Sequence, residues 1–480
     1  MRVYDSLTRA EHEFEPVRAG HVGMYVCGMT VQDKPHIGHF LPFLTADVVR
    51  RYLEHKSYEV THVQNFTDVD DKIIARANEE GITSEAVAER NIQKYYEAAE
   101  AMNLLPATHY PKATGHIAEI IALIEDLIAK GHAYAASNGD VYFRVRTFEG
   151  YGKLSGRKVD DLMSGARIEV GEEKEDPLDF ALWKAAKPDE PQWPSPWSGG
   201  RPGWHIECSA MAMKYLGESF DMHGGGRDLL FPHHENEIAQ SEASTGKPFV
   251  RYWIHNGLLY TSGQKMSKSL GNFFLMEDLL QSFSPDELRF FLLSTHFRSQ
   301  AEYSEERLAE SRAAFERIRE GLGRIHEALD VAGRSDAGLV SEAATALRES
   351  SERLEGEFFE AMEHDFNTAG ALGKVFEIVR HCNRFLDAPL REGDAGALRE
   401  VFGRLESLLQ LLGFYPLGLA AGLMHSRDGA PAEIEALARK RVEARTARDF
   451  AAADALRQQI AAEGWIVEDR PDGYRLKKQT

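Results

Sequence analysis

A strand–helix–strand pattern in the first 66 residues restricts the fold more than any other feature of the chain. His21 to Cys27 (HVGMYVC) is a short run of β-favouring residues that stops at Gly28. Apolar residues within 40–56 then recur at helical spacing, and Tyr58 to Phe66 (YEVTHVQNF) is a second β-favouring run, followed by a predicted helix at 68–81. A helix between two strands is typical of parallel pairing, so the first ~120 residues are predicted to form a parallel α/β domain.

The pattern changes from about residue 117 to residue 214. A predicted helix (IAEIIALIEDLIAKG) leads into a short β-like run (DVYFRV) and then into a stretch rich in charge, glycine and proline. Such a composition is typical of loops, and we interpret about 117–200 as an insertion in the α/β domain. The α/β pattern returns with YWIHNGLLY. The domain as a whole is predicted to span 1–300, with a lysine-loop region at about 255–300.

Beyond this region the chain is predominantly helical. Ser284, Pro285 and Glu287 form a capping box with proline at the first helical position, which predicts a helix through ELRFFLLSTH. Apolar residues spaced by threes, fours and a seven predict one buried helix face at Leu308, Phe315, Ile318, Leu322 and Ile325. Further helical stretches near 341–363, 368–386 and 396–413 predict a helical bundle over 301–420.

A linker and a small C-terminal domain are predicted over 421–480. The stretch FYPLGLAAGLMHSRDGAP interrupts the helices, and a predicted helix pair and a short β-like tail, WIVEDRPDGYRL, follow it. The predicted fold class is therefore α/β, with an inserted segment, followed by a helical bundle and a small mixed α/β unit.

Composition and charge narrow the function classes. Hydrophobic residues make up 43% of the chain and charged residues 28%, an ordinary globular balance. The formal charge of −20 does not suit an indiscriminate nucleic-acid binder, which is normally basic. The first residues lack an apolar signal core, and no later run approaches ~18 uninterrupted apolar residues, so we expect a cytoplasmic protein without membrane contact. Three widely separated cysteines do not make a disulfide framework.

Two of these cysteines belong to a candidate metal site. His233 and Glu237 are four residues apart, so on a helix both side chains share one face. Cys27 ends a predicted strand, where the loops of an α/β sheet converge on ligands, and Cys208 lies in GWHIECSAM. Two thiolates, an imidazole and a carboxylate make a plausible zinc site.

The spacing leaves alternatives open. Both cysteines can instead be core residues, with the His-Glu pair on the surface, because neither cysteine has a CxxC partner. His234 and Glu235 are rival ligands that spacing does not reject. A zinc site with four protein ligands is by default closed and structural. Cys382 lies on an amphipathic helix and is predicted to be a core residue.

The stretch PHIGH suggests an anion site. Pro35 ends a loop and starts a helix, which puts His36 and His39 in the first turn, near free backbone N–H groups and the positive end of the helix dipole. Gly38 allows a planar group to approach the backbone closely. The two histidines can then donate to phosphate oxygens. The alternatives are a His-x-x-His metal pair or simple capping.

Two further loops agree with nucleotide binding. In KMSKS, Lys265 and Lys268 lie among small residues, and lysine is a mobile point charge suited to pyrophosphate. The glycine-rich turn ending at Gly226 precedes Asp228, which can accept from ribose hydroxyls. Each loop by itself is equally compatible with a solvated surface. Together with PHIGH they indicate a site for nucleotide phosphate and ribose.

The combination resembles the class I aminoacyl-tRNA synthetases, and within them the cysteinyl-tRNA synthetase family. The resemblance rests on YVCGMTVQDKPHIGHF, QNFTDVDDKI, GWHIECSAM, GGGRDLLFPHHENEIAQ, KMSKSLGN, RDFAAADALRQQI and IVEDRPDG, and so spans essentially the whole chain. HIGH and KMSKS specify the class, and the cysteine, histidine and glutamate set specifies the amino acid. The resemblance implies a Rossmann-type catalytic domain split by a connective insertion, then a helical bundle and an anticodon-binding domain.

The resemblance also implies roles for individual residues. The zinc ligands are expected to be Cys27, Cys208, His233 and Glu237. The residues expected to act on ATP are His36, Gly38, His39, Gly226, Asp228, Lys265 and Lys268, of which the histidines and lysines are also the expected catalytic residues. Thr67, Trp204 and His223 match positions of the cysteine pocket.

The implied reaction has two steps, with ATP, L-cysteine and a cysteine-accepting tRNA as partners and Mg²⁺ accompanying ATP. The cysteine carboxylate attacks the α-phosphorus of ATP, which requires positioning and charge stabilisation but no protein nucleophile. The 2′-OH of the terminal adenosine of the tRNA then takes the cysteine. We expect the zinc to accept the substrate thiolate as an additional ligand. A pocket that recognises only the shape of the side chain would separate cysteine from serine by only ~10²-fold. A monomer is expected.

The alternative function is a ligase of the same fold that passes cysteine to a small amine, such as an amino sugar. Such an enzyme needs no anticodon reader, so the tail distinguishes the two. Residues 433–480 hold ten Lys and Arg against nine Asp and Glu, a net +1 in a chain of −20. Within them, the basic stretch 439–448 is the expected RNA-facing segment or else a solvated helix face. Trp465 is predicted to fill a small core, whereas Tyr474 can stack on an anticodon base.

Overall fold

The protein divides into two compact units, Met1–Tyr415 and Pro416–Thr480. The computed structural model describes residues 1–159, 161, 173–261, 264–265, 274–332, 339–391, 393–415, 434, 436–438, 440–441, 444, 450–470 and 473–478. No helix in these ranges is long and apolar enough to cross a membrane.

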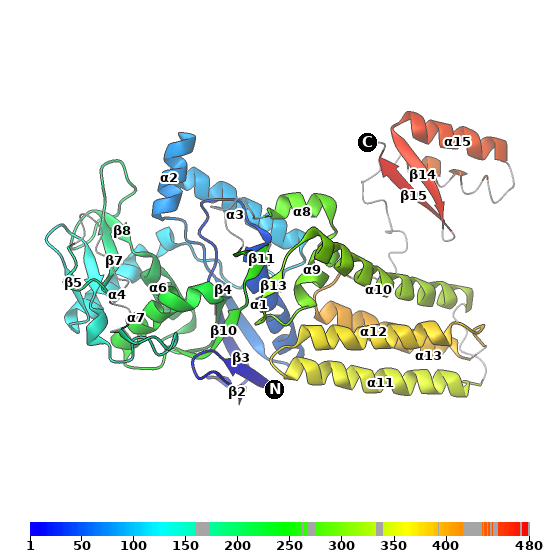
Figure 1. Cartoon of the computed structure of the whole chain (residues 1–480), viewed down its shortest axis with the longest axis horizontal. Helices are drawn as coiled ribbons and strands as arrows, with labels where there is room; N and C mark the ends of the chain where they lie inside the picture. Colours follow the sequence, from blue (N-terminus) through cyan, green and yellow to red (C-terminus); the bar gives the residue numbers. More distant parts are fainter. Residues whose placement is uncertain are drawn as a thin grey trace. The chain divides into compact units, whose positions relative to one another are not determined.

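A four-stranded parallel sheet organises the first unit (Figure 1). Its strands run in the order β10 (Val250–Asn256), β9 (Phe220–Gly226), β3 (His21–Val26) and β4 (Glu59–Gln64). The predicted strand–helix–strand unit is confirmed, since β3 and β4 pair in parallel and α1 (Ile37–His55) connects them. Parallel strands are normally covered on both faces, and β3 is accordingly buried from Val22 to Val26.

Helices pack around this sheet. α1 contacts its strands, and α6 (Trp204–Leu216) contacts β3 and β4. The other helical elements of this region are α2 (Asp71–Glu80), α3 (Ser84–Ala101), η3 (Arg227–Leu229), η4 (Leu230–His234) and α7 (Glu235–Thr245). A two-stranded ribbon of β1 (Arg2–Asp5) and β2 (Ala10–Glu13) precedes β3. The helix α2 was predicted from the sequence, whereas α3 was not.

The segment interpreted as an insertion contains its own antiparallel sheet. The strand order is β5 (Ala133–Ala135), β6 (Val141–Phe143), β7 (Phe180–Ala185) and β8 (Gly200–Pro202). The helices η1 (Ala113–His116), α4 (Ile117–Ala129) and η2 (Val145–Thr147) complete it. A separate apolar core that includes Ile124, Phe143 and Trp183 lies between α4 and this sheet.

The last part of this unit, from Glu305 onward, is a helical bundle. A small sheet of β12 (Gln264–Lys265), β11 (Leu259–Thr261) and β13 (Ala301–Glu302), with α8 (Met276–Ser282) and α9 (Pro285–Leu293), leads into it. The bundle consists of α10 (Glu305–Ala332), α11 (Glu342–Glu363), α12 (Thr368–Phe385) and α13 (Ala395–Leu411), which lie side by side in Figure 1. The predicted face from Leu308 to Ile325 is buried, and so is Cys382, so both predictions are confirmed.

The second unit pairs one helix with a hairpin. α15 (Phe450–Ala462) precedes β14 (Trp465–Arg470) and β15 (Gly473–Lys478), which pair in antiparallel fashion. Trp465 is 5% exposed and packs with Ile434 and Ile460, which confirms its predicted core role. Most of the basic stretch 439–448 and the side chain of Tyr474 lie outside the described residues.

Candidate active site

The carboxyl ends of the parallel strands converge on one place, as expected for an α/β sheet. Cys27 follows β3, and Asn65 follows β4 beside it. The Gly28 N–H donates to Asn65 Oδ1 at 2.9 Å, and a Cβ at Gly28 would lie 1.6 Å from the Asn65 carbonyl oxygen. The contact between these two loops therefore requires glycine, and it fixes Cys27 at the end of its strand.

Four side chains from four elements meet above these strand ends. Cys27, Cys208, His233 and Glu237 each offer one ligand atom, and these atoms lie within 4.8 Å of one another. The Sγ atoms of Cys27 and Cys208 are 3.8 Å apart, and His233 Nε2 is 3.1 Å from Glu237 Oε1. All four residues are buried. We refer to them as the ligand tetrad.

The local helix geometry brings His233 and Glu237 together. η4 runs directly into α7, so the two residues are separated by one helical turn and their side chains project on the same side. Cys208 lies in the second turn of α6, which packs against α7. The predicted pairing of the histidine and the carboxylate on one helix face is thus present.

The electrostatics of the tetrad favour a bound cation. A hydrogen bond from the Cys27 thiol lowers the pKa of Cys208 to about 6, so that sulfur is mainly thiolate at neutral pH. Burial by itself would raise the pKa of Glu237, but the neighbouring His223 and His233 hold that pKa well below its usual range. Two buried anions side by side are costly unless a positive charge compensates them. Burial lowers the pKa of His233, but Glu237 and Cys208 raise it to about 10, so either a protonated His233 or a metal ion in place of that proton supplies the charge.

The spacing of the tetrad fits zinc. In a tetrahedron with zinc–sulfur bonds of about 2.3 Å, two sulfur ligands lie roughly 3.8 Å apart. The Cys27 and Cys208 sulfurs have that separation. The donor set of two sulfurs, one nitrogen and one oxygen is also one that zinc accepts. The residues present therefore suit a zinc ion.

The two rival ligands have different positions. The Glu235 carboxylate accepts from the Leu154 N–H at 3.3 Å and the Ser155 N–H at 2.8 Å, so it holds a backbone loop and is not part of the tetrad. His234 does lie at the site, with Nε2 3.4 Å from Cys27 Sγ.

A second group of four potential ligands shares two members with the tetrad. It consists of Cys27, His223, His234 and Glu237. His223 Nε2 lies 2.8 Å from Glu237 Oε2, and His234 Nδ1 lies 2.8 Å from His255 Nε2. Spacing had left His234 open as an alternative ligand, and the geometry keeps it as a close neighbour of the site.

Trp204 and His205 surround the tetrad histidine. The Trp204 ring stacks on His233 with centroids 4.2 Å apart, and 37% of Trp204 is exposed. On the other edge, His205 Nδ1 lies 2.9 Å from His233 Nδ1. Such a partner on the second ring nitrogen orients a ligating histidine. His205 was not predicted from the sequence, although its position three residues before Cys208 on the same helix is a usable signal.

Thr67 contacts the buried carboxyl group of Glu207, which was not predicted from the sequence either. The Thr67 hydroxyl donates to Glu207 Oε2 at 3.0 Å. Burial, and then the charge of Cys208, raise the pKa of Glu207 well above its usual range. Within the described residues Glu207 Oε1 has no hydrogen-bond partner. Thr67 and its neighbour Glu207 therefore line the same buried region as the tetrad.

The two histidines of PHIGH lie at the start of α1, as predicted. His36 is the N-cap residue, and its backbone N–H donates to His39 Nδ1 at 3.4 Å. Their rings stack with centroids 3.6 Å apart. Burial lowers the pKa of His36 to about 4 and that of His39 well below its usual value, so both rings are neutral at pH 7.

The other residues predicted for the nucleotide lie in two places. Gly226 ends β9, and the negative charge of Asp228 acts on the His36 ring. The backbone of Lys265 forms part of β12, and its side chain lies outside the described residues, as does the whole of Lys268.

Three sequence families match the chain. Residues 13–313 match tRNA synthetases class I (C) catalytic domain, residues 357–416 match the DALR domain, and residues 427–475 match the Cysteinyl-tRNA ligase anticodon binding domain.

Full-length relatives and solved structures agree with these matches. The chain is 51% identical over 483 residues to the cysteine–tRNA ligase of Nitratidesulfovibrio vulgaris, covering 98% of this chain and 99% of the relative. It is equally similar to that of Geobacter sulfurreducens, covering 99% of each chain. Among solved structures, methionyl-tRNA synthetase of Mycobacterium tuberculosis in complex with methionyl-adenylate gives a TM-score of 0.64 at 16% identity, covering 82% of this chain and 91% of that one. At that identity the likeness concerns the fold.

Proposed function

The chain belongs to the cysteine–tRNA ligase family, and from this premise we propose which of its residues carry the reaction. The family match makes it an ATP-dependent ligase that attaches cysteine to tRNA. The observation that carries the assignment is agreement with these relatives over nearly the whole chain, including the anticodon-binding segment. That segment argues against the alternative ligase for a small amine, which needs no anticodon reader.

The ligand tetrad is proposed to hold one zinc ion. The 3.8 Å sulfur separation and the buried anionic charge of Cys208 and Glu237 support it. Zinc would supply a soft Lewis acid that takes the substrate sulfur as a thiolate, which distinguishes cysteine from serine chemically. Cys27 and His233 complete the set of four ligands. The metal, and not the shape of the pocket, would then select cysteine over serine.

The cysteine pocket is proposed to lie around Thr67 and Trp204. Trp204 covers one face of His233 and remains partly exposed, so it can pack against a bound amino acid. Thr67 is held by Glu207 and presents a hydroxyl beside the same region. His223 is fully buried and lies 2.8 Å from Glu237. We assign it to holding that carboxylate, not to direct contact with cysteine.

The start of α1 is proposed to bind the phosphates of ATP. His36 and His39 are neutral at pH 7, so their N–H groups can donate to phosphate oxygens without bringing a fixed charge. Gly38 would keep the first turn open, and Gly226 with Asp228 would meet the ribose. Lys265 and Lys268 would compensate the charge of the leaving pyrophosphate, with Mg²⁺ accompanying ATP.

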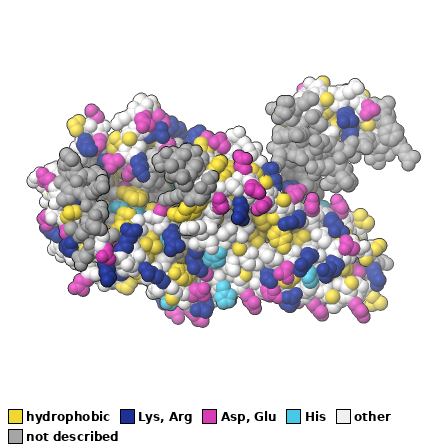
Figure 2. All heavy atoms as spheres, viewed as in Figure 1, with side chains coloured by type: hydrophobic (Ala, Val, Ile, Leu, Met, Phe, Trp, Pro, Cys, Tyr) yellow, Lys and Arg dark blue, Asp and Glu magenta, His cyan; other side chains and the backbone are white. Residues whose placement is uncertain are grey.

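The second step is proposed to transfer cysteine from the adenylate to the 2′-OH of the terminal adenosine of the tRNA. Figure 2 shows positive and negative side chains interspersed over the displayed face instead of one continuous basic field. The protein has a net charge of −20 and would repel tRNA over most of its surface. We therefore expect tRNA to bind along a restricted track. A cytoplasmic monomer is the simplest state for this reaction.

The test combines two assays on the zinc-replete protein. ATP–pyrophosphate exchange is measured with cysteine and with serine, and charging is measured with radiolabelled cysteine and total tRNA. Exchange with cysteine alone, together with label on tRNA, is the expected result. Exchange without charging of competent tRNA would favour the small-amine alternative. Equal exchange with serine would contradict selection through the metal.

A further inference from the structure

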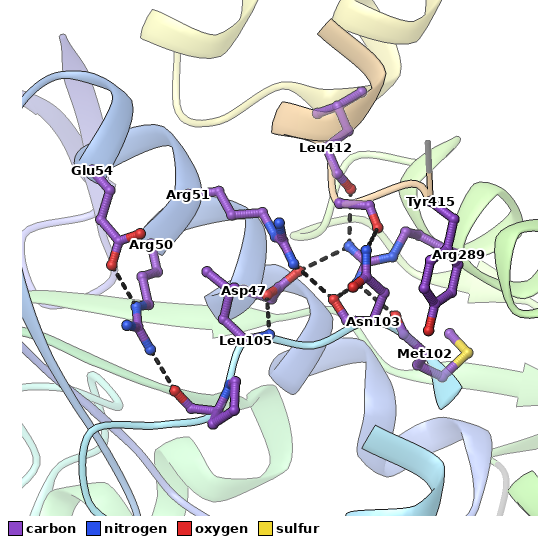
Figure 3. Close-up of polar contacts among 12 residues, drawn as sticks. Asp47, Arg50, Arg51, Glu54, Met102, Asn103, Leu105, Arg289, Leu412 and Tyr415 are labelled. Carbon is purple, nitrogen blue, oxygen red and sulfur yellow. Dashed lines mark hydrogen bonds and ion pairs between the residues drawn. The ribbon is translucent and has the colours of Figure 1, made fainter. Parts of the chain in front are cut away.

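The end of the first unit is held by a buried network (Figure 3). Leu412, Gly413 and Tyr415 follow α13, and the next residue, Pro416, begins the second unit. We call Leu412–Tyr415 the exit segment, because the chain leaves the first unit through it. Its polar contacts in the described part of the chain reach residues of α9 and of the end of α3.

Arg289 on α9 is the centre of the network. It is 1% exposed, and Nη1 donates to Asp47 Oδ2 at 2.9 Å and to the Leu412 carbonyl at 2.9 Å. Nη2 donates to the carbonyls of Met102 at 2.7 Å and Asn103 at 3.0 Å. One guanidinium thereby joins α1, the end of α3 and the end of α13. A planar fork of donors suits this geometry, and a single ammonium does not.

Asp47 and Asn103 extend the network on either side. Asp47 is 2% exposed, and its carboxylate also accepts from Arg51 Nε at 3.0 Å and from the Leu105 N–H at 2.8 Å. Asn103 has a φ of 53° and donates from Nδ2 to the Gly413 carbonyl at 2.7 Å. The exit segment is therefore hydrogen-bonded both to Arg289 and to Asn103, and these two residues are also bonded to each other.

Glycine is required at the contact point. Gly413 has a φ of +77°, and a Cβ there would lie 2.1 Å from Arg289 Nη1. The exit segment thus passes directly over the guanidinium, in a conformation that L side chains rarely adopt. Its path is fixed by the backbone as well as by the hydrogen bonds.

Tyr415 secures the last position of the exit segment. Its hydroxyl donates to the Glu100 carbonyl at 3.0 Å, and its backbone N–H donates to Asp286 Oδ1 at 3.2 Å. Both partners belong to the region matched by the catalytic family. Tyr415 is 40% exposed, so the bond made by its hydroxyl can be removed by substitution without opening the core.

The same helix that carries Asp47 begins at the proposed ATP site. α1 starts next to His36 and reaches Asp47 about ten residues, or roughly 15 Å, further on. Most of its length is fixed by apolar side chains, among them Phe40, Leu44 and Val48. The helix therefore has an anchor that does not depend on Arg289, whereas the exit segment depends on the network.

From this arrangement we propose that Arg289, Asp47 and Asn103 are positioning residues for the tRNA step. They fix Leu412–Tyr415, the last residues of the first unit, relative to the helix that begins at His36. Loosening that point disturbs transfer of cysteine to tRNA and leaves formation of the adenylate intact. The proposal rests on the proposed function, since it concerns the second step of that reaction.

The test uses a full-length double variant, Tyr415→Phe with Asn103→Gly. The first change removes one hydroxyl, and the second removes an amide while tolerating the positive φ. The matched control is Tyr96→Phe, because Tyr96 on α3 is 37% exposed, close to the 40% of Tyr415. The measurements are cysteine-dependent ATP–pyrophosphate exchange, kcat/KM for tRNA charging and the thermal midpoint.

We expect the double variant to lose about tenfold or more in kcat/KM for tRNA while exchange stays within about twofold of wild type. The control should match wild type in both assays. Unchanged charging, or equal losses in charging and exchange, would overturn the proposal. Arg289→Lys should deepen the same split if it folds, and the double variant decides the question if it does not. Failure of the wild-type protein to exchange or charge would instead refute the proposed function.

Discussion

At the residue scale, the direction in which a side chain projects from its helix decides whether two sequence neighbours belong to the same site. Glu235 and Glu237 are two positions apart on α7, about 200° around a helix, so their side chains project to opposite sides. Glu237 joins the ligand tetrad, and Glu235 holds the backbone at Ser155. The sequence offered both as ligands, and only the orientation of the helix separates them.

This separation gives a matched pair of substitutions. Glu237→Gln removes the anionic oxygen of the tetrad, so we expect the purified protein to hold zinc at least about tenfold more weakly and to lose most cysteine-dependent exchange. Glu235→Gln should keep full zinc content, although it weakens the acceptor for two backbone N–H groups. Metal analysis of both proteins measures the difference. Equal zinc content in the two variants would contradict the assignment.

His62 provides a prediction about acid stability. It is 4% exposed, and within the described residues neither ring nitrogen has a hydrogen-bond partner. Burial, and then the charge of Arg50, lower the pKa of His62 to about 3. Below pH 6.5 the unfolded chain therefore takes up a proton that the folded chain refuses, and stability falls as pH drops towards 3. This one group should remove about 2 kcal/mol between pH 8 and pH 5.

Denaturant unfolding of His62→Phe at several pH values tests this. The phenyl ring keeps the volume and cannot titrate, so the variant should lose about 2 kcal/mol less than wild type between pH 8 and pH 5. Stability at pH 8 gives the packing cost by itself and serves as the reference. Parallel pH curves for the two proteins would mean that His62 does not carry the effect.

At the element scale, local signals placed helix starts well. The capping box predicted at Ser284 is present, with the Ser284 hydroxyl accepting from the Glu287 N–H and Glu287 accepting from the Ser284 N–H. A cap uses only residues three apart, so its geometry is local and readable from sequence. α3 was missed although Thr83 caps it in the same way, because no reciprocal acceptor follows three residues later.

Ser284→Ala should therefore destabilise the first unit by about 1 kcal/mol, since an N–H of α9 loses its acceptor. Ser407 is exposed within α13 and makes no cap, so Ser407→Ala should be neutral or slightly stabilising. Chemical denaturation of both proteins measures the contrast. A loss at Ser407 equal to that at Ser284 would show that general loss of hydroxyls, not capping, is responsible.

At the scale of the whole molecule, the proposed metal connects four elements of the first unit. Cys27 follows β3, Cys208 is on α6, and His233 and Glu237 come from η4 and α7. A ligand that binds only the folded chain stabilises it by mass action, by about 4 kcal/mol when its concentration is 1,000 times the dissociation constant. The site should therefore contribute to stability as well as to selection.

Removal of the metal tests both effects together. Protein stripped with a chelator should show a lower thermal midpoint and no cysteine-dependent exchange, and added zinc should restore both. Added magnesium is the control, because it prefers oxygen ligands and should restore neither. Full exchange in protein shown by metal analysis to be zinc-free would contradict the proposed role.

The features that the sequence determined by itself follow from periodic patterns or from residues that are close together in the chain. The alternation of strand and helix predicted the parallel sheet around β3 and β4, three- and four-residue spacing predicted the buried face at Phe315, and the one-turn separation of His233 and Glu237 predicted a shared helix face. Each follows from backbone geometry over a few residues. The motifs at His36 and Lys265 added the family resemblance.

Only the tertiary structure decided which distant residues meet. It brought Cys27 within 3.8 Å of Cys208, 181 positions later, and it placed His223 against Glu237. It also joined Asp47 to Arg289 across 242 positions. Such contacts depend on how strands are ordered and how helices pack, and no local period encodes that order. The four residues of the ligand tetrad could therefore be named from the sequence through the family resemblance, whereas the contact of His205 with His233 and the exit network could not.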